Sequence, residues 1–187
     1  MKRKRGYEVL KFIMHGNHCY VSTDYVKGIP LIFWMKYHSV IPKEQMCCWI
    51  LEIAQNLRQF HRCRDGQAYQ YMNPYSVIVS EERVYLLDLG SRKQEELLHQ
   101  MQHRSVRGNF LSPGNQYYQK TSEEEDIYGL GRTIQFMLAS AEMEPPLSRW
   151  EEFKFQRVIV RCLSQNPRKR YHTVQEVLTN LHKNTKL

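Results

Sequence analysis

A carboxylate followed by glycine ends a short apolar run near the middle of the chain. The run Val84–Leu87 leads directly into Asp88, and Gly90 follows two residues later. A carboxylate at the end of a strand can hold a divalent cation beside a phosphate, because Mg²⁺ takes oxygen ligands and is often bound together with substrate phosphates. Asp88 is therefore the first candidate for metal-assisted phosphate chemistry.

The elements that must position this carboxylate can be predicted from the residues just before it. Ser76–Val79 and Val84–Leu87 are apolar and rich in β-branched residues, and the charged residues 81–83 separate them. This pattern predicts a strand, a tight turn and a second strand. Asn73-Pro74 marks a further turn in front of the first strand.

Residues 69–90 resemble the catalytic loop and metal-binding segment of protein kinases, H-R-D-L-x-x-x-N followed by D-F-G. Tyr69–Met72 stand where that motif has His, Arg, Asp and Leu. Ser76 stands at the position of its Asn, and Asp88–Gly90 stand at the position of D-F-G. The resemblance implies that the scaffold of the motif is kept and that most of its catalytic groups are lost.

Phosphoryl transfer by this fold needs a base, a lysine on the phosphates and two metal positions. Tyr71, at the base position, is a neutral phenol near pH 7. Asn73 replaces the catalytic-loop lysine of many Ser/Thr kinases, and the hydroxyl of Ser76 coordinates a metal less well than an amide carbonyl. Asp88 is the one metal-ligand candidate retained, and we favour the interpretation that it caps local backbone amides. We therefore expect no catalytic residues and no cofactor; the alternative is ATP with Mg²⁺.

The N-terminal residues are expected to form a β-hairpin, because residues 8–14 and 18–23 alternate around His15-Gly16-Asn17. Asp24, Tyr25 and Val26 then resemble the kinase hinge, whose backbone binds adenine, and they are cofactor-binding candidates only in the ATP alternative. Only six residues precede the first predicted strand. We therefore expect this polypeptide to lack the rest of a kinase N-terminal lobe, including its Gly-rich loop and V-A-I-K lysine.

Apolar periodicity predicts the helices of a kinase-like C-terminal lobe. It is strongest over Pro42–His61, where the apolar residues recur at steps of four and three: Met46, Ile50, Ile53, Leu57 and Phe60. Three capping boxes predict the starts of further helices, at Ser122–Glu125, Ser148–Glu151 and Thr173–Glu176. The apolar stretch Ile29–Met35 predicts a short helix, and a helix is expected within Ser91–Arg107, folded over the former active site.

Two residues match structural positions of the kinase family. Asp126 begins a D-x-W/Y-S-x-G-like sequence, which implies that its carboxylate accepts hydrogen bonds from the backbone of the catalytic loop. Asn166–Arg170 resembles the family's (D/N)-P-x-x-R ending. In kinases this arginine pairs with the Glu of A-P-E, but Gly114 stands at that position here. The resemblance therefore implies that Arg170 has lost its usual partner.

The expected fold class is α+β, mainly α, in a single kinase-like domain over residues 7–182. Residues 7–28 would be the remnant hairpin and hinge of the N-terminal lobe, and residues 29–182 the C-terminal lobe. Residues 1–6 form a basic tail and residues 183–187 a C-terminal tail. A chain of 187 residues that is 42% hydrophobic is long enough to bury a sizeable core.

Charge and cysteine content restrict the function classes. The net charge is +8, but the basic excess lies within Lys2–Arg5 and after Pro167. Proteins that bind nucleic acid usually carry a basic stripe on the body of the domain. The body of this chain has no basic excess, so we expect no nucleic-acid binding. Five cysteines without C-x-x-C spacing indicate a reduced, cytoplasmic setting. No apolar run reaches membrane-spanning length, and no signal peptide is recognised.

These observations predict a pseudokinase that acts as a protein-interaction or regulatory module. The ribbon Tyr7–Thr23 would have unpaired edges, and Phe33 and Trp34 belong to an apolar run too long to be covered entirely by the core. We expect a protein partner or a second copy on this surface, which an absent N-terminal lobe would leave bare. The simpler alternative is a compact monomer in which the helix expected in residues 91–107 folds back and covers this surface. The functional alternatives are a nucleotide-binding pseudokinase and an atypical Ser/Thr kinase, the latter as a whole protein or as a fragment of a longer kinase.

Overall fold

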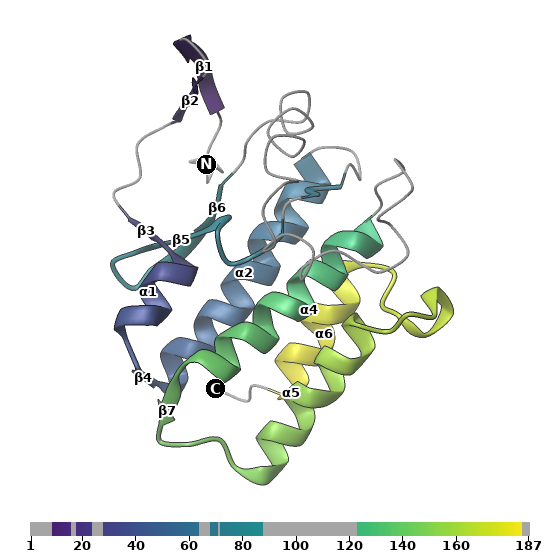
Figure 1. Cartoon of the computed structure of the whole chain (residues 1–187). Helices are drawn as coiled ribbons and strands as arrows, with labels where there is room; N and C mark the ends of the chain where they lie inside the picture. The colour runs from purple at the N-terminus through teal and green to yellow at the C-terminus, as the bar shows by residue number, and fades with distance from the viewer. Residues whose placement is uncertain are drawn as a thin grey trace, which may run out of the picture.

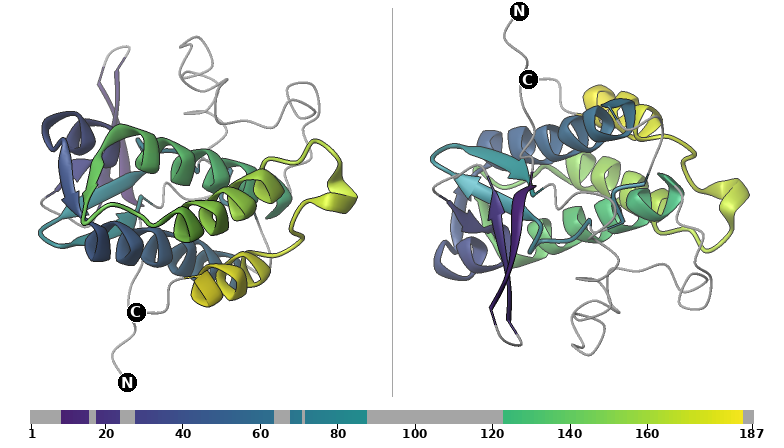
Figure 2. Two further views of the ribbon diagram at one scale, coloured as in Figure 1. Left: turned by 90° about the horizontal axis from the view of Figure 1, so that it is seen from below. Right: turned by 90° about the horizontal axis from the view of Figure 1, so that it is seen from above.

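Four helices pack side by side and carry most of the core (Figure 1). They are α2 (Lys43–Cys63), α4 (Glu123–Ser140), α5 (Arg149–Cys162) and α6 (Val174–Asn184). Figure 2 shows α2 and α6 on one side of this bundle and α4 and α5 on the other. The computed structural model describes residues 9–15, 18–23, 28–63, 68–70, 72–87 and 123–184. The fold is mainly α with short strands, as the sequence predicts.

The predicted apolar stripe of α2 is the centre of the core. Met46, Ile50, Ile53 and Leu57 are fully buried, and Phe60 packs against them while partly exposed. Burying one such side chain stabilises the fold by roughly 1.5–3 kcal/mol. The helix begins at Lys43 and not at the predicted Pro42, because residues 40–42 form the short strand β4 (Val40–Pro42). This strand pairs in parallel with β7 (Glu142–Glu144), which follows α4.

A small antiparallel sheet carries the central hairpin. β5 (Val77–Ser80) and β6 (Arg83–Leu86) pair from Val77 opposite Leu86 to Ser80 opposite Arg83. Two residues connect these strands, and the first of them, Glu81, has a positive φ of 54°, as tight hairpin turns require. The predicted strand–turn–strand is confirmed. A third strand, β3 (Ile29–Pro30), pairs with the other edge of β5 and leads into helix α1 (Leu31–Tyr37).

The predicted N-terminal hairpin is also present. β1 (Val9–His15) and β2 (His18–Thr23) pair antiparallel, and they lie at the top of Figure 1. Within the described parts of the chain they pair only with each other. A two-stranded ribbon of this kind is marginally stable without further packing.

Side-chain capping fixes the starts of α5 and α6. The Ser148 hydroxyl accepts a hydrogen bond from the Glu151 amide at 3.3 Å, and the Glu151 carboxylate accepts one from the Ser148 amide at 2.8 Å. A 3-10 turn, η2 (Pro167–Lys169), leads the chain toward α6. At the start of α6 the Thr173 hydroxyl accepts a hydrogen bond from the Glu176 amide at 3.3 Å. Both predicted boxes therefore lie at helix starts. The helix predicted to start at the Ser122 box is α4, which begins at Glu123; Ser122 itself and the helix expected within Ser91–Arg107 lie outside the described residues.

The described cysteines differ in their exposure. Cys47 and Cys162 are buried, and burial raises the pKa of Cys47 to about 11 and that of Cys162 to about 12. Cys48, the next residue after Cys47, is exposed. The two positions are consecutive on a helix with one apolar face, and 100° of rotation carries Cys48 out of the core. Across the ranges given above, no helix is long and apolar enough to cross a membrane.

Candidate functional site

The loop between α2 and β5 is held by its backbone to the first turn of α4. The Tyr69 amide donates to Asp126 Oδ2 at 2.5 Å, and the Gln70 amide donates to Asp126 Oδ1 at 2.6 Å. Asp126 is buried, so these hydrogen bonds are shielded from water. Gln70 takes a positive φ of 65°, which few residues other than glycine adopt. The anchored backbone therefore follows a strained path that Asp126 stabilises.

His61, near the end of α2, makes the third contact to Asp126. His61 Nε2 donates to Asp126 Oδ2 at 2.7 Å, and His61 Nδ1 lies 3.2 Å from Glu123 Oε1. Burial lowers the pKa of His61, but the hydrogen bond and charge of Asp126, with the charge of Glu123, raise it above the ordinary 6.5. Three donors thus converge on the Asp126 carboxylate. His61 and Asp126 form a pair of a protonated imidazole and a carboxylate. The sequence analysis did not single out His61, because its partners are distant in the chain.

α4 approaches the loop closely enough to require a glycine. A Cβ atom on Gly129 would lie 2.5 Å from the Met72 carbonyl oxygen and 3.0 Å from Met72 Cβ. Such contacts are shorter than van der Waals separation, so any side chain here would push the helix away from the loop. Gly129 therefore fixes the distance between α4 and the loop, while Asp126 fixes the register.

Asn73 and Ser76 use their polar groups to close the turn that precedes β5. The Ser76 hydroxyl donates to the Asn73 carbonyl at 2.8 Å and accepts from the Asn73 amide at 3.2 Å. Asn73 Oδ1 accepts from the Tyr75 amide at 2.8 Å. Both side chains are buried. The hydroxyl at the metal-ligand position of the kinase motif is thus engaged as donor and acceptor within its own loop.

Tyr69 links this loop to the end of β6. Its side chain is fully buried, and its hydroxyl donates to the Leu87 carbonyl, immediately before Asp88. The edge of its ring meets Phe60 with centroids 5.1 Å apart. The phenol therefore fills apolar space and ties the loop to the carboxylate-bearing segment, which combines two properties of a buried tyrosine.

Several predicted site residues lie outside the described residues. These are Tyr71, the retained metal candidate Asp88, the hinge candidates Asp24, Tyr25 and Val26, and the A-P-E-like position Gly114. In the part of the chain that the structure describes, no three His, Cys, Asp or Glu side chains gather in a way that could hold a metal ion.

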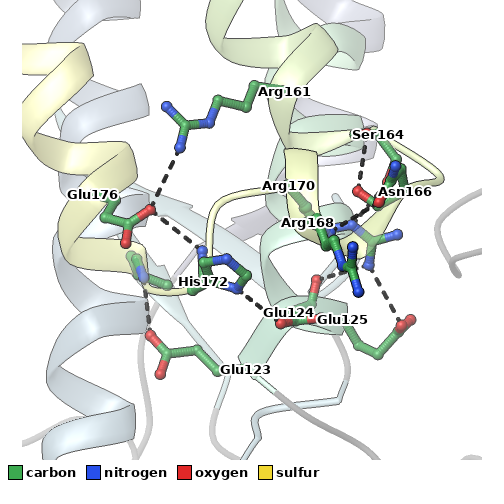
Figure 3. A network of polar contacts seen from close by, with 11 residues as sticks. Glu123, Glu124, Glu125, Arg161, Ser164, Asn166, Arg168, Arg170, His172 and Glu176 are labelled. Carbon is green, nitrogen blue, oxygen red and sulfur yellow. Dashed lines mark hydrogen bonds and ion pairs between the residues drawn. The ribbon is translucent and has the colours of Figure 1, made fainter.

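Arg170 is buried between α4 and the segment before α6 (Figure 3). Its Nε donates to the Ser164 carbonyl at 2.9 Å, and its Nη1 donates to the Glu124 carbonyl at 3.3 Å. Nη1 also lies 3.6 Å from Glu125 Oε1, and the guanidinium lies over the Tyr128 ring at 5.5 Å. Arg170 was expected to lack the carboxylate partner that it has in kinases. Glu125 of α4 is its ion-pair partner here.

Three consecutive glutamates at the start of α4 hold the C-terminal part of the chain (Figure 3). Besides the pair of Glu125 with Arg170, Glu124 Oε1 lies 3.1 Å from His172 Nδ1, and Glu123 Oε1 accepts from the Val174 amide at 2.9 Å. Carboxylates in the first turn of a helix also interact favourably with its macrodipole. The sequence identified these glutamates as capping residues only, since their long-range contacts leave no local signal.

The two predicted contact residues of α1 differ in their surroundings. Phe33 is 46% exposed, and its ring is nearly perpendicular to that of Tyr75, with the centroids 5.9 Å apart. Trp34 is half-buried: it stacks on His38 at 3.8 Å and meets the buried Trp49 edge-on at 4.8 Å. Phe33 is therefore the more accessible of the two, and Trp34 mainly joins α1 to α2.

Comparison with known proteins places the fold. No family model matches the chain. Two curated relatives are the serine/threonine-protein kinases PknG of Mycobacterium leprae and of Mycolicibacterium smegmatis. Each is 24% identical to this chain, over 87% and 89% of its length and 22% of the relative in both cases. The chain therefore spans about a fifth of the length of the curated relatives that it matches.

Solved structures, a kinase domain among them, superpose on nearly the whole chain. The PknI kinase domain of Mycobacterium tuberculosis matches with a TM-score of 0.69 at 18% identity, over 100% of this chain and 74% of that one. A structure described as PpkA-294 in its apo form matches with a TM-score of 0.68 at 18% identity, over 97% of this chain and 69% of that one. The chain has a protein-kinase-like fold over most of its length.

Proposed function

We propose that this chain is a kinase-like C-terminal lobe that does not transfer phosphate and works as a protein-interaction or regulatory module. The observation that carries the proposal is the closed turn at Asn73 and Ser76. The Ser76 hydroxyl is held between a backbone acceptor and a backbone donor of its own turn, so rotating it out of the turn toward a Mg²⁺ ion would break these hydrogen bonds. Breaking buried hydrogen bonds costs about 1–3 kcal/mol for each group left unsatisfied.

The residue types around this turn support the same proposal. Tyr71 offers a phenol where the kinase motif has an aspartate, and Asn73 offers an amide where many kinases have a lysine. The side-chain oxygen Oδ1 of Asn73 accepts a hydrogen bond from the Tyr75 backbone amide at 2.8 Å. The base and the lysine of the kinase motif have thus been replaced, and Asn73 and Ser76 hold the loop; Asp88 is the one candidate group retained.

Residual kinase activity with ATP and Mg²⁺ is the second candidate function. Both curated relatives are serine/threonine kinases. The backbone anchor from Asp126 to Tyr69 and Gln70 keeps the loop ordered, and the Tyr69 hydroxyl ties it to the residue before Asp88. Asp88 would be the metal ligand in this case.

The proposed contact surface lies around α1 and the start of β3. Ile29, 47% exposed, belongs to β3, which forms one edge of the small sheet, and Phe33, 46% exposed, lies in α1 directly after this strand. Exposed apolar side chains grouped in this way usually mark contacts with another protein. The occupant we propose is a protein partner or a second copy of the chain.

A phosphotransfer assay tests the proposed absence of catalysis. The purified chain is incubated with labelled ATP, Mg²⁺ or Mn²⁺, and generic protein substrates, and Asp88→Ala serves as the matched control. We expect equal label transfer by the chain, by the variant and by a boiled sample, since loss of a single charge-stabilising group already slows catalysis by about 10²–10³. Transfer that disappears in Asp88→Ala would establish the second candidate instead.

A further inference from the structure

α5 exposes a row of apolar side chains on the side that faces away from the core. Trp150, Phe153 and Val160 are 64%, 56% and 60% exposed. Their spacing of three and seven residues places them along one side of the helix. The opposite side holds the buried residues of the helix, which are Phe155, Val158, Ile159 and Cys162. α5 runs along the outside of the bundle, so this row faces solvent (Figure 1).

Basic side chains accompany the row. At 100° per residue, four of them fall on the outward half of the helix: Arg149, Lys154, Arg157 and Arg161. Arg161 forms an ion pair with Glu176 at 3.8 Å. The other three basic side chains supply the positive charge of this face. By the same angles, Glu151 falls on the side of the buried residues and Glu152 falls just outside the outward half. One of them, Glu151, is bound by Ser148 and by Lys43 at 3.2 Å, and these contacts lower its pKa to about 2.

The aromatic part of the row is organised by stacking. The Trp150 and Phe153 rings stack with centroids 5.8 Å apart, and the Lys154 ammonium lies 5.4 Å from the centre of the Trp150 ring. Tryptophan and phenylalanine beside Lys and Arg are typical of helices that lie in the headgroup region of a bilayer. The aromatic rings enter the interface, and the long basic side chains extend to the phosphates.

We propose that this outer face of α5 binds the surface of an anionic phospholipid bilayer, without crossing it. The charge of the face selects this occupant. A second copy would bring the same arginines opposite one another, and like charges repel. The two longest stretches outside the described ranges, residues 1–8 and 88–122, each contain more basic than acidic residues, so they are poor partners as well.

Shape also favours a lipid surface. The row lies along the ridge of one helix, and a flat bilayer can meet Trp150, Phe153 and Val160 together. A partner helix would instead need a groove between two elements. This inference goes beyond the proposed function and uses a different surface from Phe33, so either one can fail without the other.

Vesicle co-sedimentation of the full chain tests the inference. The partition coefficient is measured on phosphatidylcholine vesicles with and without phosphatidylserine. A basic side chain near an anionic bilayer contributes about 1 kcal/mol, which is roughly a fivefold change in partitioning. We expect Arg149→Glu/Arg157→Glu to bind anionic vesicles at least about 25-fold more weakly than the wild type. The control Lys36→Glu/Arg62→Glu makes the same change in net charge at exposed positions of α1 and α2, and it should lose much less.

Tryptophan fluorescence gives an independent readout. Of the three tryptophans, Trp49 is buried, Trp34 is half-buried and Trp150 is 64% exposed. Anionic vesicles should shift the emission to shorter wavelength and protect it from acrylamide, and Trp150→Phe should abolish both effects. Matching circular dichroism spectra and melting curves show that each variant is folded.

Four results would overturn the inference. The first is equal binding to both kinds of vesicle, or to neither. The second is an equal loss in the two double variants, which would indicate attraction by net charge alone. The third is a Trp150 already protected from acrylamide without lipid, which would place a segment of the chain or a second copy on the face. The fourth is a Trp150 shift with an acidic amphipathic peptide but not with anionic vesicles, which would make the partner a protein.

Discussion

At the scale of single residues, Asp126 is a main source of the stability of the loop. Asp126 receives hydrogen bonds from His61, from the Tyr69 amide and from the Gln70 amide, all in a buried place. Removing one member of a buried charged pair typically costs about 3–5 kcal/mol, because the other charge stays behind without compensation. The loop therefore depends on a pair of side chains that do not belong to it.

The protonation of His61 should make stability depend on pH. Because its pKa is raised on folding above the ordinary 6.5, the folded state binds the proton more tightly than the unfolded state does. The stabilisation is fully present below pH 6.5 and is lost as pH rises through the raised pKa, with a slope of at most about 1.4 kcal/mol per pH unit. Denaturant unfolding at a series of pH values measures it. His61→Gln, which keeps an N–H donor but does not titrate, should show no such slope; an identical slope in both proteins would contradict the assignment.

The hydroxyl of Ser76 should contribute more than a surface hydroxyl does. Ser76→Ala removes one acceptor and one donor from a fully buried turn, so we expect a loss of about 1–3 kcal/mol in the free energy of unfolding. Ser164→Ala, which removes one hydrogen bond from an exposed hydroxyl, should cost less than about 1 kcal/mol. Equal effects in urea unfolding would show that the turn is not specially stabilised.

At the scale of elements, the distance between α4 and the loop is the most constrained feature. Gly129→Ala replaces a poor helix former by the best one, which alone would stabilise by about 1 kcal/mol. The new Cβ atom would lie 2.5 Å from the Met72 carbonyl, so we expect a net destabilisation of about 1–3 kcal/mol. Ala139→Gly, at an exposed position of the same helix, should cost only about 1 kcal/mol. A more stable Gly129→Ala protein would show that helix and loop can separate.

The elements that the sequence predicted are those whose signals are local. The α2 stripe and the Ser148 and Thr173 caps depend on neighbours within one or two turns, and the hairpin at residues 77–86 depends on a two-residue turn. The parallel pair of β4 and β7 was missed, because strands of three residues about a hundred positions apart have no periodicity of their own. The partners of His61 and Arg170 and the packing of Trp34 were missed for the same reason: they are set by tertiary contacts.

At the scale of the whole molecule, the proposed function predicts how the fold responds to nucleotide. A ligand at a hundred times its dissociation constant adds about 2.7 kcal/mol, which raises the melting temperature of a domain of this size by several degrees. We expect Mg-ATP to leave the melting temperature unchanged. An increase that Asp88→Ala abolishes would favour the nucleotide-binding alternative.

The exposed surface of α1 predicts the behaviour of the molecule in concentrated solution. If a second copy occupies it, light scattering should show a mass that rises with protein concentration, and Phe33→Glu should hold the protein monomeric. Gln135→Glu adds the same charge at an exposed position of α4 and should leave the association unchanged. A wild type that stays monomeric and does not enhance the fluorescence of an apolar dye would argue against this surface as an interface.

The anchoring of the loop through main-chain amides bears on how such a protein can change over generations. Asp126 contacts the amides of residues 69 and 70, and every amino acid except proline supplies an amide. Substitutions at these two positions therefore leave the hydrogen bonds in place, whatever they do to the chemistry of the side chains. A lineage can therefore change the side chains at these two positions one at a time and still inherit the shape of the loop.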